Sequence, residues 1–536
     1  MANEDLINFI DKDHLKTLFP LRSTQFIAKY GYKEILTYIN EFIFKENNEK
    51  NHQEEFFFLS QPLVYAAKNS HHLRQCFFLD PIAVIYLYDF VFRNSKYFQM
   101  QSINYRQRFG YSFTGNKSNS STNEYKAFRD RISELKIRYS YLGMIDISNC
   151  FNNIYHHDLK SYLCRKISNK EGSRFGKYLR EINEGRSTSC MPQGYFPIKV
   201  IGNHFLSFIE QSREIKSEHI VRFMDDIYLF SHSMDTIKED IFVIQRLIGE
   251  KGLSLNEEKT FVGNSKDKDN NIGDIKKSLL EKRRTYITSY LDDYEEDEVD
   301  LILTEEETLF LKELLHNEKS LLDEDIELIL SLLINDLEET LDLVELVLEN
   351  SPHLTKALYH HLRKNDNIPS NIIDIFDKFL ENVRIQEFQL FWITKIMIDY
   401  FEINEDTIDL LFKIYFHSSA SNIIKCLILE LNENNYGLLE IKQKVARGAA
   451  PELVISALIG LLNHEKSNRN HIYNYVGKSS KFMKIITEVL KKIDIKEDTD
   501  LYLNKKKEVV LIKKAVKKNQ SLEFLFGDSD DDDLPF

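Results

Sequence analysis

The sequence has few of the features that mark disulfide-bonded, zinc-stabilised or membrane-spanning proteins. The cysteines are odd in number and none is spaced as CxxC, which argues against a disulfide framework and against structural zinc. They are Cys76, Cys150, Cys164, Cys190 and Cys426. No run of about 18 uncharged apolar residues occurs, so we expect no membrane span. The opening MANEDLINFIDKD is acidic and polar where a signal peptide would be basic and then apolar, which predicts a cytoplasmic protein.

Net positive charge is also missing, and this alone disfavours a nucleic-acid-binding protein. The formal net charge is -14 over 536 residues. The charge is unevenly distributed, however: residues 1–290 carry 42 Lys and Arg against 35 Asp and Glu, and the remainder carries 28 against 49. Residues 101–200 hold 17 basic and 8 acidic side chains. A basic segment beside acidic residues fits phosphate binding near a metal site, although a solvated surface has the same composition.

The length and the local patterns predict an α+β part at the N-terminal end. A chain of 536 residues is too long for one core, so we expect two or three domains. Within residues 1–295, short apolar runs bounded by turns, YLGMIDIS and HIVRFMDDIYLFS, indicate strands, and helical stretches separate them. Residues 112–122 (SFTGNKSNSST) read as a polar loop.

Residues 296–500 show helical periodicity without a strand signal. The segment 336–349 places Leu337, Leu341, Val344 and Leu348 on one helical face. Similar stripes recur along this region between polar breaks, which predicts an all-α helical repeat (HEAT-like) domain, with a plain helical bundle as the alternative. Residues 501–536 run from a basic stretch into DSDDDDLPF, a tail that we expect to be partly disordered.

A pair of aspartates stands between two apolar runs in VRFMDDIYLF, residues 221–230. This pattern predicts a tight β-hairpin with Asp225 and Asp226 at its tip. Paired carboxylates at a turn can hold Mg²⁺, since this hard cation prefers oxygen ligands and leaves positions open for phosphate. An Asp-Asp pair alone is more often a solvated turn, so the assignment depends on further carboxylates.

A third aspartate follows an apolar run in MIDISNCFNNIYHH, residues 144–157. Two-metal phosphoryl transfer needs a carboxylate from a separate strand, and Asp146 lies at the predicted end of one. It precedes the pair by about 80 residues, which suits one sheet with helices between. Taken alone, Asp146 could equally cap the end of its strand.

Two further segments complete the pattern. SCMPQGYFPIKVIGNHFLSFIE (189–210) reads as a Pro-Gln-Gly turn leading into an amphipathic helix, and GLSLNEEKT (252–260) as a turn, a strand and a turn. In order and spacing, the four elements resemble motifs A, B, C and D of reverse transcriptases. Asp146 matches motif A, Gln193-Gly194 motif B, Phe223 to Asp226 motif C, and Leu255-Asn256 with Lys259 motif D. The resemblance covers roughly residues 100–290 and implies reverse-transcriptase-like fingers and palm within residues 1–295.

The resemblance implies a catalytic role for three residues. Asp146, Asp225 and Asp226 would bind two Mg²⁺ ions, with Mn²⁺ as a substitute. These ions would activate a 3′-hydroxyl and stabilise the leaving pyrophosphate. The expected activity is that of an RNA-directed DNA polymerase, a nucleotidyltransferase that consumes deoxynucleoside triphosphates and yields DNA.

The same resemblance assigns substrate-binding roles. Phe151 matches the aromatic steric gate that excludes a 2′-hydroxyl, and Gln193 and Gly194 would lie beside the incoming nucleotide and template. Lys259 would bring a positive charge or a proton to the leaving group. Core packing for Phe151 and a solvated surface for Lys259 are the alternatives.

Two arginines in INYRQRFGY are the candidates for a fingers contact to the triphosphate. Arg106 and Arg108 suit this task because the guanidinium group binds phosphate through two parallel hydrogen bonds. A solvated surface position is the alternative for both.

The chain departs from retroviral and group II intron reverse transcriptases in three respects. Motif C begins with Phe223 instead of tyrosine, Tyr195 and Phe196 follow the motif B glycine where small residues are usual, and no RNase H or integrase signal is present. A palm followed by a helical repeat resembles the bacterial antiviral group, the abortive-infection (Abi) and defence-associated (Drt) reverse transcriptases. Some members of that group make DNA without a nucleic-acid template from a protein hydroxyl, and Tyr195 and Phe196 would be consistent with a crowded template path.

Three functions therefore stay open at this point. The first is a Mg-dependent DNA polymerase acting in antiphage defence in the bacterial cytoplasm. The second is template-independent or protein-templated, protein-primed DNA synthesis. The third is an inert palm whose acidic helical domain binds a partner. The resemblance implies a homo-oligomer, and an RNA template, a non-coding RNA or a second reverse transcriptase subunit are further candidate partners.

Overall fold

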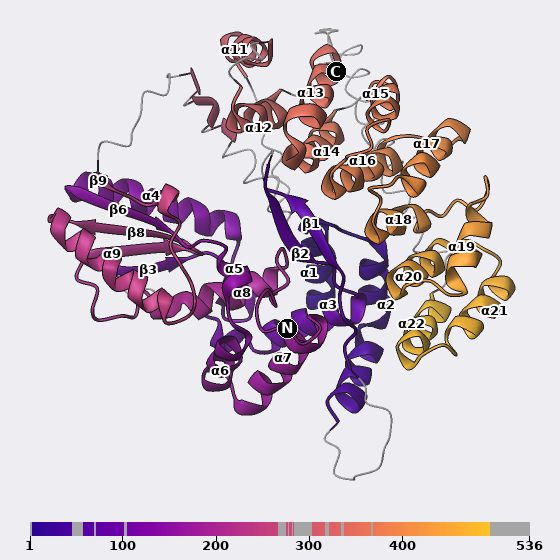
Figure 1. Cartoon of the computed structure of the whole chain (residues 1–536), viewed down its shortest axis with the longest axis horizontal. Helices are drawn as coiled ribbons and strands as arrows, with labels where there is room; N and C mark the ends of the chain where they lie inside the picture. The colour runs from indigo at the N-terminus through magenta and orange to yellow at the C-terminus, as the bar shows by residue number, and fades with distance from the viewer. Residues whose placement is uncertain are drawn as a thin grey trace, which may run out of the picture.

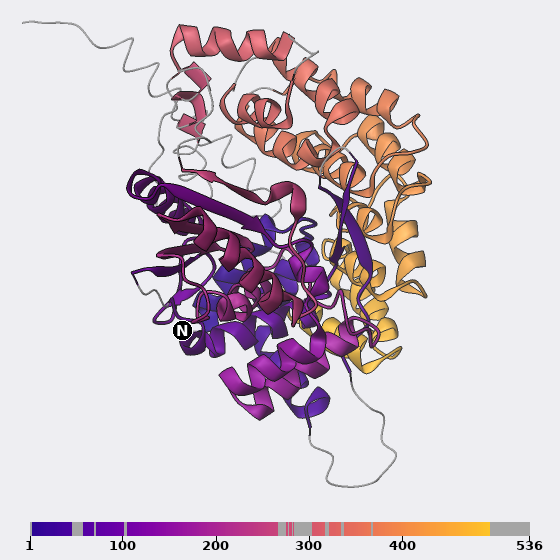
Figure 2. The ribbon, with the colours of Figure 1, turned by 60° about the vertical axis from the view of Figure 1, so that its left-hand side comes forward.

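The computed structural model describes residues 3–45, 57–68, 71–100, 104–265, parts of 275–283, and then 303–316, 321–333, 337–365 and 368–493. The predicted basic and acidic tail, 501–536, lies outside the described residues. The rest forms an N-terminal part (residues 3–265) of helices and strands, and a helical array that curves around one side of it (Figures 1 and 2). This arrangement confirms the predicted α+β fold with an all-α C-terminal region.

A five-stranded mixed sheet lies at one end of the N-terminal part (Figure 1). Its order is β3-β7-β8-β6-β9, with β3 and β7 parallel and the other neighbours antiparallel. The strands are β3 (Arg106–Phe109), β6 (Tyr141–Asp146), β7 (His219–Phe223), β8 (Asp226–Ser231) and β9 (Phe261–Asn264). Both the strand that runs into Asp146 and the hairpin at residues 221–230 are thus present as predicted.

The sheet is buried on both faces because its strands alternate apolar side chains between two helices. Phe128, Ile132 and Leu135 of α4 (Ser121–Arg138) pack on Leu142 and the other apolar residues of one face. On the other face lies α9 (Met234–Gly249), which joins the main core of the N-terminal part. The carboxyl end of β6 and the β7–β8 turn therefore project from a rigid platform.

Helices and two small hairpins make up the rest of the N-terminal part. The helices are α1 (Asn3–Lys16), α2 (Arg22–Tyr38), α3 (Pro81–Arg93), α5 (Cys150–Asn153), α6 (His156–Lys166), α7 (Asn169–Ile182) and α8 (Phe196–Phe205). One hairpin joins β1 (Leu63–Ala67) to β2 (Leu73–Phe77). The other joins β4 (Phe113–Thr114) to β5 (Lys117–Ser118). It lies in the segment 112–122, for which the sequence predicted a loop; the prediction missed these two short strands.

The helical array (α11 to α22) is a two-layered stack. Each of α12, α14, α16, α18, α20 and α22 contacts the next helix of that series, and the helices between them form an outer layer. The bounds are α11 (Glu305–His316), α12 (Asp323–Leu332), α13 (Leu337–Asn350), α14 (Thr355–Lys364), α15 (Ile372–Phe379), α16 (Glu387–Tyr400), α17 (Glu405–Phe416), α18 (Asn422–Leu429), α19 (Leu438–Ala446), α20 (Pro451–Gly460), α21 (Lys466–Val476) and α22 (Lys481–Lys492). This stacking is typical of helical repeats and confirms that reading of the sequence.

The inner layer of the array is joined to the start of α2. The carboxylate of Glu430, only 2% exposed, accepts hydrogen bonds from the main-chain N–H groups of Arg22 (2.8 Å) and Ser23 (3.1 Å). It thereby satisfies donors that a helix N-terminus leaves without partners. Asp399 adds an ion pair with the Arg22 side chain at 2.9 Å. The predicted boundary at residue 295 stays a prediction, but the two parts are held together by buried polar contacts.

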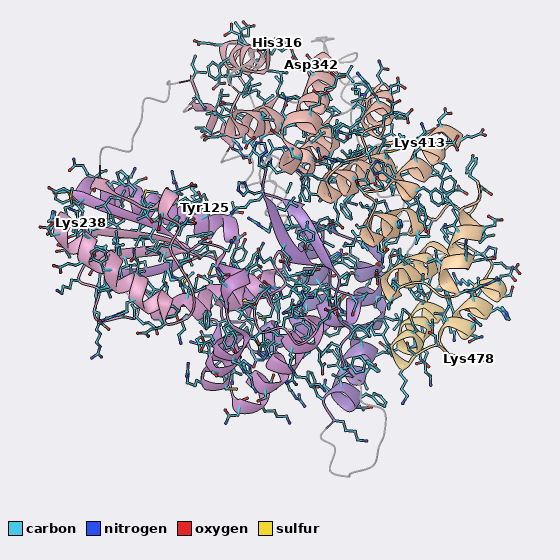
Figure 3. All side chains as sticks on the ribbon, in the orientation of Figure 1. Tyr125, Lys238, His316, Asp342, Lys413 and Lys478 are labelled. Atoms are coloured by element: carbon cyan, nitrogen blue, oxygen red, sulfur yellow. The ribbon has the colours of Figure 1, made fainter. Side chains whose placement is uncertain are left out.

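The outer layer of the array faces solvent. Lys413 near the end of α17 and Lys478 after α21 extend outward from the helices, as Figure 3 shows. Lys413 pairs there with Asp377, an exposed contact that contributes little to stability. No described helix is both long enough and apolar enough to span a bilayer.

Candidate active site

Three aspartates lie near one another in the sheet, where β6 ends and the β7–β8 hairpin turns. Asp146 is the last residue of β6 and pairs in register with Asp226, the first residue of β8. Asp225 lies in the two-residue turn between β7 and β8. We call this group the three-carboxylate site. The sequence predicted all three residues, and the strand register brings them together.

The turn that carries Asp225 is strained. Met224 adopts φ 56, a left-handed conformation that costs a residue with a Cβ about 1–2 kcal/mol. Two-residue hairpin turns favour positive φ at their first position, because this matches the twist of the flanking strands. The strain therefore has a geometric consequence: it lets Asp225 and Asp226 follow one another directly at the edge of the sheet.

The electrostatics of the site disfavour three negative charges. Burial, reinforced by the charge of Asp146 and opposed by a main-chain hydrogen bond, raises the pKa of Asp225. Asp226 is exposed at the start of β8, yet partial desolvation by the surrounding protein and then the charges of Asp225 and Asp146 raise its pKa to about 6. Crowded carboxylates of this kind are stabilised in their charged form by a cation. The residue types therefore suit divalent metal ions, with Asp146, Asp225 and Asp226 as the candidate ligands, although their ligand oxygens do not all lie within 4.8 Å of one another.

Two residues of the segment after α9, Asn256 and Lys259, contact Asp146. Asn256 donates from Nδ2 to Asp146 Oδ2 at 3.1 Å, and its main-chain N–H donates to the Asp146 carbonyl at 2.8 Å. Lys259 Nζ lies 3.4 Å from Asp146 Oδ1, on a side chain that is 60% exposed. Leu255 forms only an isolated bridge with Ile147, and a 3₁₀ turn (Glu257–Lys259) follows where a turn was expected. Lys259 therefore lies beside Asp146. Its predicted role at the leaving group stays a prediction.

Phe151 lies on the short helix α5 just after Asp146. The helix begins after Asn149, whose left-handed conformation (φ 44) turns the chain sharply away from β6. The ring of Phe151 is half-buried against Gly202 of α8, where a Cβ would lie only 2.5 Å from Phe151 Cε1. The ring of Phe151 can occupy this position only because residue 202 has no side chain. Part of the ring surface is left accessible, as a gate residue requires.

Gln193 and Gly194 form the turn before α8. Gln193 Nε2 donates to Asn152 Oδ1 at 2.6 Å, which joins this turn to α5. Gly194 has φ +102, a conformation that a residue with a Cβ rarely adopts. Both predicted residues therefore lie in contact with, or next to, the segment that carries Phe151. Their predicted contacts to nucleotide and template stay predictions.

The two bulky residues after Gly194 point into the protein core. Tyr195 is 4% exposed, and its hydroxyl accepts a hydrogen bond from the main-chain N–H of Leu79 at 3.3 Å. Phe196 is 5% exposed and packs among the rings of Phe9 and Phe113, amongst others. Their size thus fills the core, and the crowded template path considered from the sequence has no support here.

The predicted triphosphate contacts of Arg106 and Arg108 are disfavoured by their surroundings. Arg106 donates to the carbonyl groups of Ser217 (2.9 Å) and Ile215 (2.7 Å). Arg108 is 3% exposed and its Nη1 lies 3.4 Å from Glu210 Oε1. Both guanidinium groups are engaged by the protein: β3 is an edge strand that pairs with β7, and its two arginines contact residues 210–217. These contacts favour a role in the structure of the sheet, and the predicted triphosphate contacts stay a prediction.

Arg74, which the sequence analysis did not select, is better placed. It is an exposed residue of the β1–β2 hairpin, and its positive charge weakly opposes the burial that raises the pKa of Asp225. An exposed arginine within electrostatic reach of the three-carboxylate site is suited to contact a triphosphate. No local pattern marks it, since only the tertiary fold brings Arg74 within electrostatic range of Asp225.

Three aspartates on a mixed sheet are compatible with two-metal phosphoryl transfer, a chemistry that polymerases share with nucleases and phosphatases. Residues 88–294 match the profile of the family described as reverse transcriptase (RNA-dependent DNA polymerase). The chain therefore contains a reverse transcriptase domain and is an enzyme of the RNA-directed DNA polymerase type.

More distant comparisons add little to this assignment. No curated protein matches the chain. Among solved structures, telomerase from Candida albicans in complex with a fragment of telomeric RNA is 11% identical, with 79% of this chain and 71% of that chain covered and a TM-score of 0.27. Apo telomerase from Candida tropicalis is 10% identical, with 89% and 73% covered and a TM-score of 0.28. Similarity at this level says nothing about the ligands of this chain.

Proposed function

We propose that this protein is a Mg²⁺-dependent DNA polymerase whose active site is the three-carboxylate site. The observation that carries the proposal is the register of β6 with β8, which places Asp146 opposite Asp226 with Asp225 beside them. Two bound divalent ions would there activate a primer 3′-hydroxyl and stabilise the leaving pyrophosphate. Mn²⁺ is a substitute with similar ligand preferences.

The residues around the metal ligands divide the remaining tasks. Asn256 and Lys259 hold the Asp146 carboxylate, so that it is oriented before substrate arrives. Phe151 would lie under the sugar and exclude a 2′-hydroxyl. Gln193 and Gly194 would contact the nucleotide and template, while Arg74 of the β1–β2 hairpin would neutralise the triphosphate.

The biological role that we propose is antiphage defence in the bacterial cytoplasm. Its support is the combination of a reverse transcriptase domain with a helical array, which resembles the Abi and Drt groups. Catalytically dead variants should then lose protection. A phage plaque assay with Asp146→Asn in the native host tests this, because protection retained by that variant would favour the reading in which the helical array binds a partner and the palm is inert.

Template use is the property that separates copying from untemplated synthesis. Purified protein would be supplied with Mg²⁺, all four deoxynucleotides and one homopolymeric RNA with its primer at a time. We expect the product composition to follow the template and incorporation to cease in Asp225→Asn. A product of fixed composition, or one bound covalently to the protein, would contradict template copying and favour protein-primed synthesis.

A further inference from the structure

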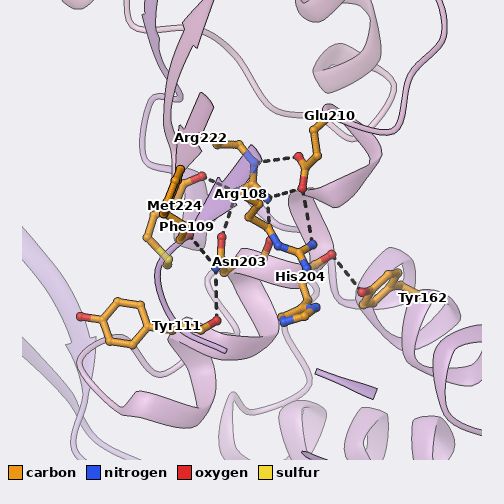
Figure 4. Close-up of polar contacts among 9 residues, drawn as sticks. All are labelled: Arg108, Phe109, Tyr111, Tyr162, Asn203, His204, Glu210, Arg222 and Met224. Carbon is orange, nitrogen blue, oxygen red and sulfur yellow. Dashed lines mark hydrogen bonds and ion pairs between the residues drawn. The ribbon is translucent and has the colours of Figure 1, made fainter. Parts of the chain in front are cut away.

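Figure 4 shows Arg222 at the centre of a polar network that includes Met224, the residue before Asp225. Arg222 is the residue of β7 that precedes Phe223, and it is 0% exposed. All five of its N–H groups have acceptors. Nε and Nη2 donate to the two carboxylate oxygens of Glu210 at 2.9 and 3.0 Å, and Nη1 and Nη2 donate to Oδ1 and the carbonyl of Asn203 at 3.1 and 2.9 Å.

The fifth of these hydrogen bonds reaches the catalytic turn. Arg222 Nη1 donates to the carbonyl of Met224 at 2.5 Å. Met224 is the residue with left-handed backbone that precedes Asp225 and Asp226. A charged donor at this carbonyl stabilises the strained turn in one orientation. The direction in which the two aspartates leave the turn is thus tied to the position of a buried guanidinium group.

Asn203 connects this network to the motif B helix. Besides accepting from Arg222, it donates from Nδ2 to the carbonyl groups of Phe109 (3.0 Å) and Tyr111 (3.2 Å), as Figure 4 shows. The residue before it on α8 is Gly202, which supports the ring of Phe151. Adjacent residues of one helix therefore contact the gate on one side and, through Arg222, the turn with the metal ligands on the other.

We propose that Arg222 and Asn203 are positioning residues that set the placement of Asp225 and Asp226 relative to the Phe151 gate. The proposal rests on the function proposed above, since it takes these aspartates as metal ligands. It predicts that loosening the network changes two properties together: the affinity for divalent metal and the discrimination between deoxyribo- and ribonucleotides.

Arg222→Lys is the sharpest variant. Lysine keeps the positive charge beside Glu210, but its single ammonium group cannot span Glu210, Asn203 and the Met224 carbonyl at once. Asn203→Ala is the second variant, which leaves Arg222 in place and removes its Oδ1 acceptor. The matched control is Arg469→Lys in α21. Arg469 is 2% exposed and donates to the carbonyls of Leu462 and Ile493, in the array and far from the sheet (Figure 1).

The first measurement is binding of Mn²⁺ to the full-length protein, followed by electron paramagnetic resonance without nucleic acid. We expect Arg222→Lys and Asn203→Ala to weaken Mn²⁺ binding by about 10- to 100-fold, the effect usual for residues that orient metal ligands. Arg469→Lys should lower the melting temperature without changing Mn²⁺ binding. The second measurement is the ratio of kcat/KM for deoxyribo- over ribonucleotides, which we expect to fall in both variants and to stay unchanged in the control.

The inference is overturned if both variants bind Mn²⁺ within twofold of the wild type and keep its sugar discrimination, whatever their melting temperatures. If Arg222→Lys does not fold, the result for Asn203→Ala decides alone. If Asp225→Asn binds Mn²⁺ as tightly as the wild type, the metal site itself is overturned, and with it the proposed function on which this inference rests.

Discussion

Asn256 holds Asp146 at two points, with its side-chain amide on the carboxylate at 3.1 Å and its main-chain N–H on the carbonyl at 2.8 Å. The segment that follows α9 is therefore fastened to the strand end that carries a proposed metal ligand. A carboxylate that is held in this way needs little reorganisation when a metal ion and substrate bind.

Asn256→Ala removes the side-chain donor and leaves the main-chain contact in place. We expect the rate of nucleotide incorporation to fall by about 10- to 100-fold, because the Asp146 carboxylate is then free to rotate. Steady-state incorporation at saturating template measures this. Asn468→Ala, an exposed asparagine bonded to Glu465, is the control and should keep the wild-type rate. A rate within twofold of the wild type in Asn256→Ala would contradict the role of this contact.

The raised pKa of Asp226 predicts how the metal-free protein responds to pH. Since this pKa lies at about 6 in the folded state, above the ordinary value of 3.8, the folded protein retains a proton that the unfolded chain has lost between these values. The free energy of unfolding should therefore fall as pH rises through this window. The raised pKa of Asp225 acts in the same direction.

Asp226→Asn tests this linkage, because asparagine does not titrate. In the metal-free state, we expect the variant to lose less stability than the wild type between about pH 4 and pH 7. Thermal unfolding monitored by circular dichroism, with a chelator present, gives the comparison. Saturating Mg²⁺ should stabilise the wild type and reduce the difference between the two proteins in the stability lost as pH rises. Parallel pH profiles for the two proteins would show that Asp226 has an ordinary pKa.

The gate can be tested by two substitutions, one that shortens the side chain of Phe151 and one at Gly202 that displaces its ring. Phe151→Val shortens the gate, so we expect ribonucleotide incorporation to rise by about 10-fold or more relative to deoxyribonucleotide incorporation. Gly202→Ala would place a Cβ 2.5 Å from Phe151 Cε1 and displace the ring, which should lower kcat/KM for deoxynucleotides. Phe242→Ala, at a residue that is 69% exposed, is the control. Unchanged discrimination in Phe151→Val would assign this ring to core packing alone.

Arg74 provides a test of the fingers assignment. Arg74→Ala removes a positive charge that acts on Asp225, and we expect KM for the nucleotide to rise by about 10-fold with a smaller change in kcat. Arg186→Ala, at a surface residue that pairs with Glu184, should leave both constants unchanged. If Arg106→Ala raises KM while Arg74→Ala does not, Arg106 and not Arg74 is the contact to the triphosphate.

The strands and the three aspartates could be predicted because their signals are local. Apolar runs bounded by turns predict β6 and the β7–β8 hairpin, and the residues that end them are the proposed metal ligands. The helical array is likewise predictable, since each helix shows its own apolar stripe. The sequence separation of about 80 residues between Asp146 and Asp225 matched one sheet, although no local signal specifies their register.

The surroundings of individual polar side chains could not be predicted. Arg108 and Arg222 are register partners on parallel strands and both contact Glu210, a residue with no sequence pattern of its own. Burial of these arginines depends on the pairing of β3 with β7. The size of Tyr195 is consistent with a crowded template path, yet its side chain lies in the core. Side-chain direction in irregular segments follows from the tertiary fold.

The most direct test of the central claim is incorporation of labelled deoxynucleotides by the purified full-length protein with Mg²⁺, compared between the wild type and Asp225→Asn. This substitution keeps the size of the side chain and removes one metal-binding charge. We predict template-directed incorporation by the wild type and a loss of at least about 1000-fold in the variant, as expected for a direct ligand of a catalytic metal. Equal incorporation by the two proteins would contradict the assignment of the three-carboxylate site as the polymerase active site.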